Sequence, residues 1–248
     1  MKIAVLSDIH GNLDALKAVM EDIHSQGAEK IFICGDVAMA GAEPAETIDY
    51  LLKERKFKDI VIIQGNTDEM ILKSTGSPDD GYTPPNETMA EALKYAQKIL
   101  SPNQKEFLFE LAPSHSEKID DISVLLVHGS TRRNNEDIYP DMPMDELAKI
   151  IEGVEENVIF CGHTHKPVIY HLGKKTVINA GSVGRPFADM PDACYVILYT
   201  AGSGKFEVNF RYVPYDYRFS AEKLSKLPFK GAEKLAQMLI KATSEYPD

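Results

Sequence analysis

Residues 2–12 read KIAVLSDIHGN and join a short apolar run to an aspartate, a histidine and a glycine. An apolar run of this length, bounded by turn residues, is typical of a strand buried on both faces. Apolar residues then recur at helical spacing, and Gly27 follows as a stop signal. The periodic residues are Leu13, Leu16, Val19, Met20 and Ile23. The stretch therefore predicts a strand, a turn and a helix, with Asp8 and His10 just past the strand.

The same pattern is repeated along the first half of the chain. Lys30–Cys34 and Asp59–Gln64 are short apolar runs that predict two further strands. Pro44–Lys53 lies between them and predicts a helix, with Pro44 near its first turn. Strands separated by helices of this length imply parallel pairing with right-handed crossovers.

The region 73–115 interrupts this alternation. Ser74–Asn86 is rich in Gly, Pro, Ser and Asp and predicts a loop, while Glu87–Leu100 and Asn103–Leu111 predict helices. We interpret the region as an insertion over the sheet edge. Two more buried runs follow, with a helical stretch between them: Ser123–Val127, Met144–Glu152 and Asn157–Cys161.

Beyond Lys166 the pattern changes to short runs with hairpin turns, which predict mostly antiparallel strands before a final helix near Ala232–Thr243. The runs are Val168–Leu172, Thr176–Asn179, Tyr195–Tyr199 and Phe206–Val213. No linker-like stretch separates the two halves. We therefore predict an α/β fold in one domain over 1–248, with two stacked mixed β-sheets flanked by helices (a four-layer αββα sandwich) and a helical insertion at about 73–115.

Composition restricts the class of partner. The chain has 248 residues, 44% hydrophobic and 26% charged, as in an ordinary globular protein. The net charge of −11 argues against nucleic acid as a partner, because binding a polyanion needs a cationic surface. A small phosphate compound stays compatible with this charge, since bound metal ions reverse the local sign.

The cysteines and the apolar runs indicate the cellular compartment of the protein. Cys34, Cys161 and Cys194 are widely spaced, form no CxxC motif and lie in or next to apolar runs, so we expect reduced core thiols. The first apolar run is too short for a signal peptide, and none approaches membrane-spanning length. We expect a cytoplasmic protein with no membrane partner. The oligomeric state stays open, a homo-oligomer included.

Five polar clusters each follow a predicted strand. They are Asp8-Ile9-His10, Gly35-Asp36, Gly65-Asn66-Thr67-Asp68, His128-Gly129 and Gly162-His163-Thr164-His165. Asp, Asn and His supply the oxygen and nitrogen donors that suit hard and borderline divalent metals. Ligands of open α/β sheets bind beyond the carboxyl ends of the strands, so the clusters predict a metal site there. The helix after Asn12 would point its positive end at a bound phosphate.

In this order the clusters resemble the calcineurin-like metallophosphoesterase family. The family pattern is D-x-H, GD, GN, a lone His and G-H-x-H, and the matching motifs span residues 8–165, about two-thirds of the chain. The Asn179–Pro186 run, NAGSVGRP, is similar to a turn in the small bacterial and archaeal phosphodiesterase-like branch.

The resemblance implies two divalent metal ions and assigns their ligands. Asp8, His10 and His165 would hold the first ion, Asn66, His128 and His163 the second, and Asp36 would bridge both. It also implies catalytic roles for Asp36, Asn66 and His128. A water between the ions, deprotonated near neutral pH, would attack phosphorus in line. Mn²⁺ is the first expectation, with Fe, Co, Ni and Zn as alternatives, because mixed nitrogen and oxygen ligands discriminate poorly among them.

The resemblance implies a phosphoesterase that hydrolyses phosphodiesters or nucleotide phosphoanhydrides, with a small phosphate ester or nucleotide as substrate. A phosphomonoesterase or protein phosphatase is the alternative. A non-catalytic interaction module on the same fold is a further alternative from another class, although such modules have typically lost metal ligands that this chain keeps. A nuclease is disfavoured, because no basic stripe is visible.

One residue departs from the family pattern. Many members carry a histidine after the GN pair, where this chain has Thr67. A threonine hydroxyl donates a hydrogen bond but is a poor general acid. We therefore expect a preference for stable leaving groups, such as those of aryl or nucleotide esters.

Four residues are candidates for substrate binding, each with a plainer alternative. Asn12 caps its helix and is also placed to touch phosphate. Arg132 and Arg133 form either a solvated basic pair or a clamp for a phosphate group. Arg185 is likewise either a solvated side chain or a phosphate ligand.

Three other polar residues have interpretations outside substrate binding. Asp68 either caps its turn or orients a ligand histidine, and His115 is expected in a solvated loop. His24 is expected on the surface at a helix end.

Overall fold

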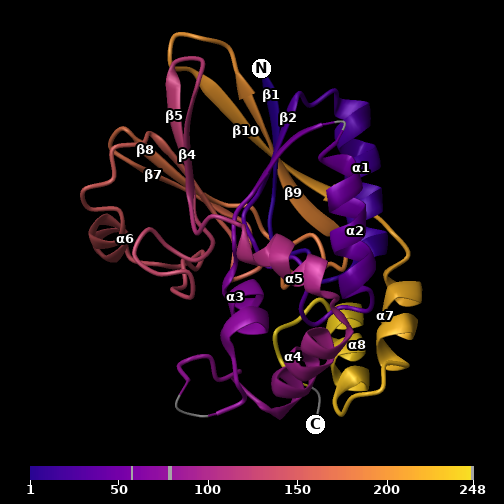
Figure 1. The fold of residues 1–248 in the computed structure, drawn as a ribbon. Coiled ribbons are helices and arrows are strands. Elements are labelled where there is room, and N and C mark those ends of the chain that lie inside the picture. Colours follow the sequence, from indigo (N-terminus) through magenta and orange to yellow (C-terminus); the bar gives the residue numbers. More distant parts are fainter. Residues whose placement is uncertain (57, 78–79, 247–248) are drawn as a thin grey trace.

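Two five-stranded β-sheets form the centre of the protein in a computed structural model that describes residues 1–56, 58–77 and 80–246 (Figure 1). The first sheet has the order β10-β9-β1-β2-β3. Its strands are β1 (Lys2–Leu6), β2 (Lys30–Ile33), β3 (Asp59–Ile62), β9 (Ala193–Thr200) and β10 (Phe206–Val213). β1, β2 and β3 are parallel, and the hairpin β9–β10 adds antiparallel to β1.

The second sheet has the order β4-β5-β6-β8-β7. Its strands are β4 (His115–Ile119), β5 (Ile122–Leu126), β6 (Val158–Cys161), β7 (Val168–Leu172) and β8 (Lys175–Asn179). β5, β6 and β8 are parallel, while β4 and β7 pair antiparallel at the edges. The prediction of two mixed sheets is confirmed.

Alternation along the strands explains why the sheets stack. In β1, Ile3 and Val5 join an apolar layer that includes Val124 and Phe160 of the second sheet. Ala4 and Leu6 point to the other face and join the core under the helices. Since successive side chains point to opposite faces, an all-apolar strand must be covered on both sides. The three cysteines are free and buried, as expected.

Helices cover the outer faces of both sheets, which confirms the predicted flanking layers. α1 (Leu13–Gln26) and α2 (Pro44–Glu54) pack on the first sheet, and α6 (Met144–Ile150) lies outside the second (Figure 1). α1 begins at the Asn12 cap and ends at Gly27, whose φ of 66° is the left-handed conformation that glycine adopts easily.

A group of helices lies beyond the carboxyl ends of the first sheet's parallel strands. They are α3 (Asn66–Lys73), α4 (Glu87–Ile99), α5 (Pro102–Phe109), α7 (Tyr217–Ser225) and α8 (Ala232–Lys241). α4 and α5 are the two helices predicted in the insertion, and both pack against α3. α8 packs against α4 and α7, which brings this C-terminal helix close to the insertion (Figure 1). Within the described ranges, no helix has the length and hydropathy needed to cross a bilayer.

Three elements were not predicted. α3 and α7 are short and begin at local caps: the Asp68 carboxylate accepts the Gly65 N–H, and the Asp216 carboxylate accepts the Phe219 N–H. His115 lies in strand β4 and contacts Glu117, so its placement in a solvated loop was wrong. β4 is a half-exposed edge strand of mixed polarity, and such a strand carries no continuous apolar run for sequence inspection to find.

Candidate metal centre

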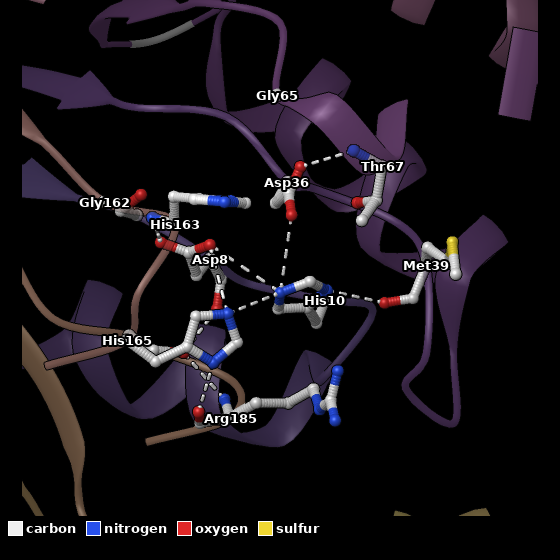
Figure 2. A network of polar contacts seen from close by, with 12 residues as sticks. Asp8, His10, Asp36, Met39, Gly65, Thr67, Gly162, His163, His165 and Arg185 are labelled. Atoms are coloured by element: carbon white, nitrogen blue, oxygen red, sulfur yellow. Dashed lines mark hydrogen bonds and ion pairs between the residues drawn. The ribbon is translucent and has the colours of Figure 1, made fainter. Parts of the chain in front are cut away.

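The five polar clusters meet at one edge of the stacked sheets. Asp8 follows β1, Asp36 follows β2, and Asn66 opens α3 after β3. The second sheet contributes His128 after β5 and His163 and His165 after β6. Figure 2 shows Asp8, His10, Asp36, His163 and His165 directed toward one another.

One group of ligand atoms consists of Asp8 Oδ1, His10 Nε2 and His165 Nε2. The two imidazole Nε2 atoms are 3.0 Å apart, and Asp8 Oδ1 is 3.2 Å from His165 Nε2 and 3.7 Å from His10 Nε2. Two ligands on one ion, each about 2.0–2.2 Å from it, lie roughly 3–3.6 Å apart. The spacing therefore fits a single divalent ion.

Asp36 lies between this group and a second one. Its Oδ2 is 3.6 Å from His10 Nε2, and its Oδ1 is 3.4 Å from His128 Nε2. His128 Nε2 is also 2.9 Å from Asn66 Oδ1. Asp8, Asp36 and His128 satisfy the spacing of a second metal-binding group. The Asp36 carboxylate thus faces both positions.

His163 lies beside these ligand groups, but its ring has a different orientation. Its backbone N–H donates to Asp8 Oδ2 at 2.9 Å, and its ring packs edge-on against His128. Its Nε2 lies 3.5 Å from Asp137 Oδ1. In the described part of the chain, its ring nitrogens belong to neither of the two ligand groups.

Hydrogen bonds orient the rings of the other three histidines of the site. Nδ1 of each ring donates to a backbone carbonyl: His10 to Met39, His128 to Cys34 and His165 to Arg185. This arrangement directs Nε2 into the site, as in metal-binding histidines.

The Nε2 atoms of His10 and His165, 3.0 Å apart, need a proton or a metal ion between them, because two imidazole lone pairs would otherwise face each other. Among the described residues, the buried Asp8 Oδ1 also has no hydrogen-bond partner. A buried acceptor without a donor is costly, and a bound cation removes that cost. The residues present therefore fit a divalent metal ion.

The backbone is strained at these positions. Ten non-glycine residues in the described ranges have positive φ, and five of them are candidate ligands. The five are Asp8, His10, Asp36, His163 and His165, with φ between 50° and 68°. This conformation is unfavourable for residues with a Cβ and tends to be retained where function requires it.

Glycines at two motif positions make room for the carboxylates. A Cβ on Gly65 would lie 2.1 Å from Asp36 Oδ1, and a Cβ on Gly162 would lie 2.3 Å from Asp8 Oδ2. Neither glycine has a positive φ. Glycine is therefore required for close approach and not for conformation.

The site holds its carboxyl groups ionised. Burial by itself would raise the pKa of Asp8, but His165 and His10 outweigh it and hold that pKa well below the ordinary value. Burial likewise opposes ionisation of Asp36, yet His128 and His10 keep its pKa low. The centre therefore presents two negative charges to a cation.

The histidines differ in protonation. Burial lowers the pKa of His165 to about 4, so its imidazole is neutral near pH 7. Burial would also lower the pKa of His128, but Asp36 and Asp8 outweigh it and raise that pKa to about 10. Without metal, His128 therefore carries a proton that a metal ion must displace.

A cleft of about 220 Å³ opens onto the ligands. His10, Asp36, Asn66, His163 and His165 are among the residues that line it. Thr67 and Arg185 also border the cleft, and the buried Thr67 hydroxyl has no hydrogen-bond partner among the described residues. Both side chains are placed to contact a molecule bound there.

The other candidates for substrate binding lie elsewhere. Asn12 Oδ1 accepts the Ala15 N–H as the cap of α1, and its amide donates to the Gly184 carbonyl and the Tyr215 hydroxyl. This confirms the capping role and leaves its amide already engaged.

Arg132 and Arg133 are exposed, and both pair with Glu136. Neither lines the cleft, so the geometry agrees with a solvated pair. The Asp68 carboxylate accepts the N–H groups of Gly65 and Val37, which makes it a cap that fixes the turns on either side of Asp36.

Sequence inspection missed the apolar part of the cleft wall. Met39, Met70, Met89, Phe187, Met238 and Tyr246 all line it. They come from three helices, two loops and the C-terminal segment, and none belongs to a recognisable motif. Only the arrangement in space identifies them.

Comparison with known proteins agrees with this geometry. The family model described as the calcineurin-like phosphoesterase superfamily domain matches residues 1–203. An uncharacterised protein of Methanocaldococcus jannaschii is 31% identical over 241 residues, covering 90% of this chain and 92% of its own.

Two solved structures are similar over nearly the whole chain. A hypothetical protein of Pyrococcus horikoshii has a TM-score of 0.82 and 26% identity, with 95% of this chain and 97% of that chain covered. A metallophosphoesterase of Sphaerobacter thermophilus has a TM-score of 0.76 and 25% identity, with 98% and 100% covered. Taken with the ligand cluster, these matches show that the chain belongs to the calcineurin-like phosphoesterase superfamily.

Proposed function

We propose that the protein is a dinuclear metal-dependent phosphoesterase that hydrolyses phosphodiesters or nucleotide phosphoanhydrides. The observation that carries the proposal is the position of Asp36, whose two carboxylate oxygens face separate groups of ligand atoms. A carboxylate in this position can hold two ions about 3.5–4 Å apart. The proposal further rests on membership of a superfamily of phosphoesterases.

The proposed ligand sets follow the sequence motifs. Asp8, His10 and His165 would hold the first ion, Asn66, His128 and His163 the second, and Asp36 both. For His163 this requires its ring to turn from Asp137, which lies 3.5 Å from its Nε2. We propose Mn²⁺ as the metal, since the mixed donor set accepts several divalent ions.

When bound, the two ions would supply positive charge at the phosphoryl oxygens and an acidified water as nucleophile. The protein's own groups position the substrate. The Arg185 guanidinium would bind non-bridging phosphoryl oxygens through its planar set of donors. The Thr67 hydroxyl, which has no partner among the residues that the structure describes, would donate a hydrogen bond to the phosphoryl group or the leaving oxygen. Because threonine is a poor proton donor, stable leaving groups should react fastest.

The Asp36→Asn variant tests the proposal. We expect the wild-type protein to bind two Mn²⁺ per chain and to hydrolyse bis-p-nitrophenyl phosphate. The variant should fold normally by circular dichroism, bind less metal by mass spectrometry and lose turnover. Asp145→Asn, on the exposed surface of α6, is the matched control and should keep wild-type activity. Unchanged turnover in Asp36→Asn, or no metal-dependent hydrolysis by the wild-type protein, would contradict the proposal.

We also propose that residues 1–248 form a single domain and that the protein works in the cytoplasm. Helices from both halves of the chain, α4 and α8, pack together beside the metal centre, which supports the first point. Three free buried thiols support the second, because they suit a reducing compartment.

A further inference from the structure

Part of the wall of the cleft is apolar and rich in methionine. Met39, Met70, Met89 and Met238 line it, together with Phe187 and Tyr246. Four of the nine methionines of the chain therefore meet at one cleft, from the loop after β2 and from helices α3, α4 and α8. Methionine packs adaptably and forms favourable contacts between its sulfur and aromatic rings.

The apolar wall is continuous with the metal ligands. The Phe187 ring stacks on the His165 ring, with centroids 4.4 Å apart and 20° between the planes. The Arg185 guanidinium lies 5.6 Å from the centre of the Phe187 ring, and one of its nitrogens is 3.9 Å from the sulfur of Met89. A molecule that reaches the metal ligands therefore also touches this wall.

Arg185 marks where an anionic group would lie. Its side chain runs alongside His10 and His165 and is 8% exposed (Figure 2). In the described part of the chain, the guanidinium contacts a thioether, a ring and the Tyr246 hydroxyl but forms no ion pair with a carboxylate. The negative charges of Asp8 and Asp36 favour the ionised guanidinium without forming an ion pair with it. Bound metal ions would neutralise those charges. A buried cation of this kind favours an anionic ligand group beside it.

The size of the cleft limits what lies against the wall. Its volume of about 220 Å³ is below the roughly 300–1,000 Å³ of pockets that bury drug-sized ligands. Met70 and Phe187 are only partly buried, and Tyr246 is 37% exposed, so the wall has an accessible rim. A single flat ring fits this space and can contact sulfur atoms and aromatic faces together.

We propose that the substrate is a phosphate ester carrying a flat aromatic group, aryl or nucleobase, that packs on the methionine wall while Arg185 binds its phosphoryl oxygens. This inference rests on the proposed phosphoesterase function and names its substrate class. The methionine wall is then the part of the site that selects the substrate.

Non-hydrolysable phosphonates test the proposal on the Mn²⁺-loaded protein. Phenyl-, cyclohexyl- and methylphosphonate share one anionic group and differ in the attached group. We expect phenylphosphonate to bind about 10- to 100-fold more tightly than methylphosphonate, because burial of one ring removes apolar surface from water. Cyclohexylphosphonate should bind more weakly than the phenyl compound, since it is not flat. Equal affinities for the phenyl and methyl compounds would overturn the proposal.

Calorimetric binding keeps this test separate from the test of catalysis. Failure to hydrolyse bis-p-nitrophenyl phosphate would contradict the proposed function. The phosphonate affinities would still show whether the methionine wall prefers an aromatic group. Thymidine 5′-phosphate distinguishes the two sources of the ring. Binding tighter than phenylphosphonate indicates a nucleobase, and weaker binding indicates an aryl group.

Two rim variants link the preference to the wall. Met70→Gln and Tyr246→Ser should each reduce the phenyl-to-methyl affinity ratio at least fivefold. Met70→Gln should leave methylphosphonate binding unchanged, whereas Tyr246→Ser should also weaken it, because the Tyr246 hydroxyl contacts the Arg185 guanidinium. Met144→Gln makes the same chemical change on α6, at a residue 41% exposed and outside the cleft, and should keep the wild-type ratio. An unchanged ratio in both folded rim variants would contradict the assignment.

Discussion

Replacing Gly65 by alanine tests why a glycine precedes Asn66 in the third motif. Gly65 has φ −92° and ψ 173°, an extended conformation open to any residue. The added methyl group would lie 2.1 Å from Asp36 Oδ1 and 2.3 Å from the Asp36 backbone nitrogen. Ordinary contacts of a Cβ atom begin at 3.4 Å, so the carboxylate or the turn must move by more than 1 Å.

Two losses add up in this variant. Overpacking of a rigid, buried position costs about 1–3 kcal/mol. Moving Asp36 also breaks the 2.9 Å hydrogen bond that its Oδ1 accepts from the Thr67 N–H, worth about 1.5–3 kcal/mol for a charged acceptor. We therefore expect Gly65→Ala to lose about 2.5–6 kcal/mol of the free energy of unfolding of the metal-free protein. Metal affinity should fall as well, because ligand distances tolerate only about ±0.2 Å.

Chemical denaturation and calorimetric Mn²⁺ titration measure the two effects. Gly153→Ala provides the control, because Gly153 has φ +77° but no atom within 4 Å of the added Cβ. Its cost should be the left-handed conformation alone, about 1–2 kcal/mol, with unchanged metal binding. If Gly65→Ala loses no more stability than Gly153→Ala and keeps its metal affinity, close approach of Asp36 is not the reason for the glycine.

Three further outcomes follow from the same geometry. Because the pKa of His128 is raised to about 10 without metal, Mn²⁺ binding near pH 7 should release a proton, and titrations in buffers of different ionisation enthalpy will measure it; no release would refute the protonated state. Burial lowers the pKa of His165 to about 4 in the native state. Between about pH 6.5 and 4, His165 is therefore protonated in the unfolded chain and neutral in the native state. The metal-free protein should therefore lose stability as pH falls through this window, and a folded His165→Asn variant should lose less, as denaturation at several pH values will show. Thr67→His should raise hydrolysis of dialkyl phosphates by about 10²-fold without changing that of bis-p-nitrophenyl phosphate, and an equal change for both esters would show that position 67 does not protonate the leaving group.

Sequence alone predicted the elements that depend on local pattern. The run that ends at Leu6 reads as a strand because both of its faces are buried, and the same holds for β2 and β6. Parallel strands collect their carboxyl ends at one edge of a sheet, which places Asp8 near Asp36. His165 follows a strand of the other sheet, so its meeting with Asp8 across 156 intervening positions was implied by the resemblance to the family. Asp8, His10 and His165, which the resemblance implied as ligands of the first ion, make up one of the two groups of possible metal ligands in the described part of the chain.

What sequence inspection missed depends on packing between distant segments. β4 lies at an edge and needs no continuous apolar run, and α3 is a short helix started by the Asp68 cap. Met238 and Tyr246 reach the cleft only because α8 packs against α4, and no local feature of the sequence encodes that contact. Sequence inspection left two interpretations of Arg132 and Arg133 open. Both side chains pair with Glu136 and do not line the cleft, so nearness to a motif in sequence does not place a side chain in the site.

Anomalous diffraction from Mn²⁺-loaded crystals tests the central proposal most directly. The predicted result is two peaks about 3.5–4 Å apart, with Asp36 touching both and the Nε2 atoms of His10 and His165 on one of them. A single peak away from Asp36, or none at all, would contradict the proposed dinuclear centre.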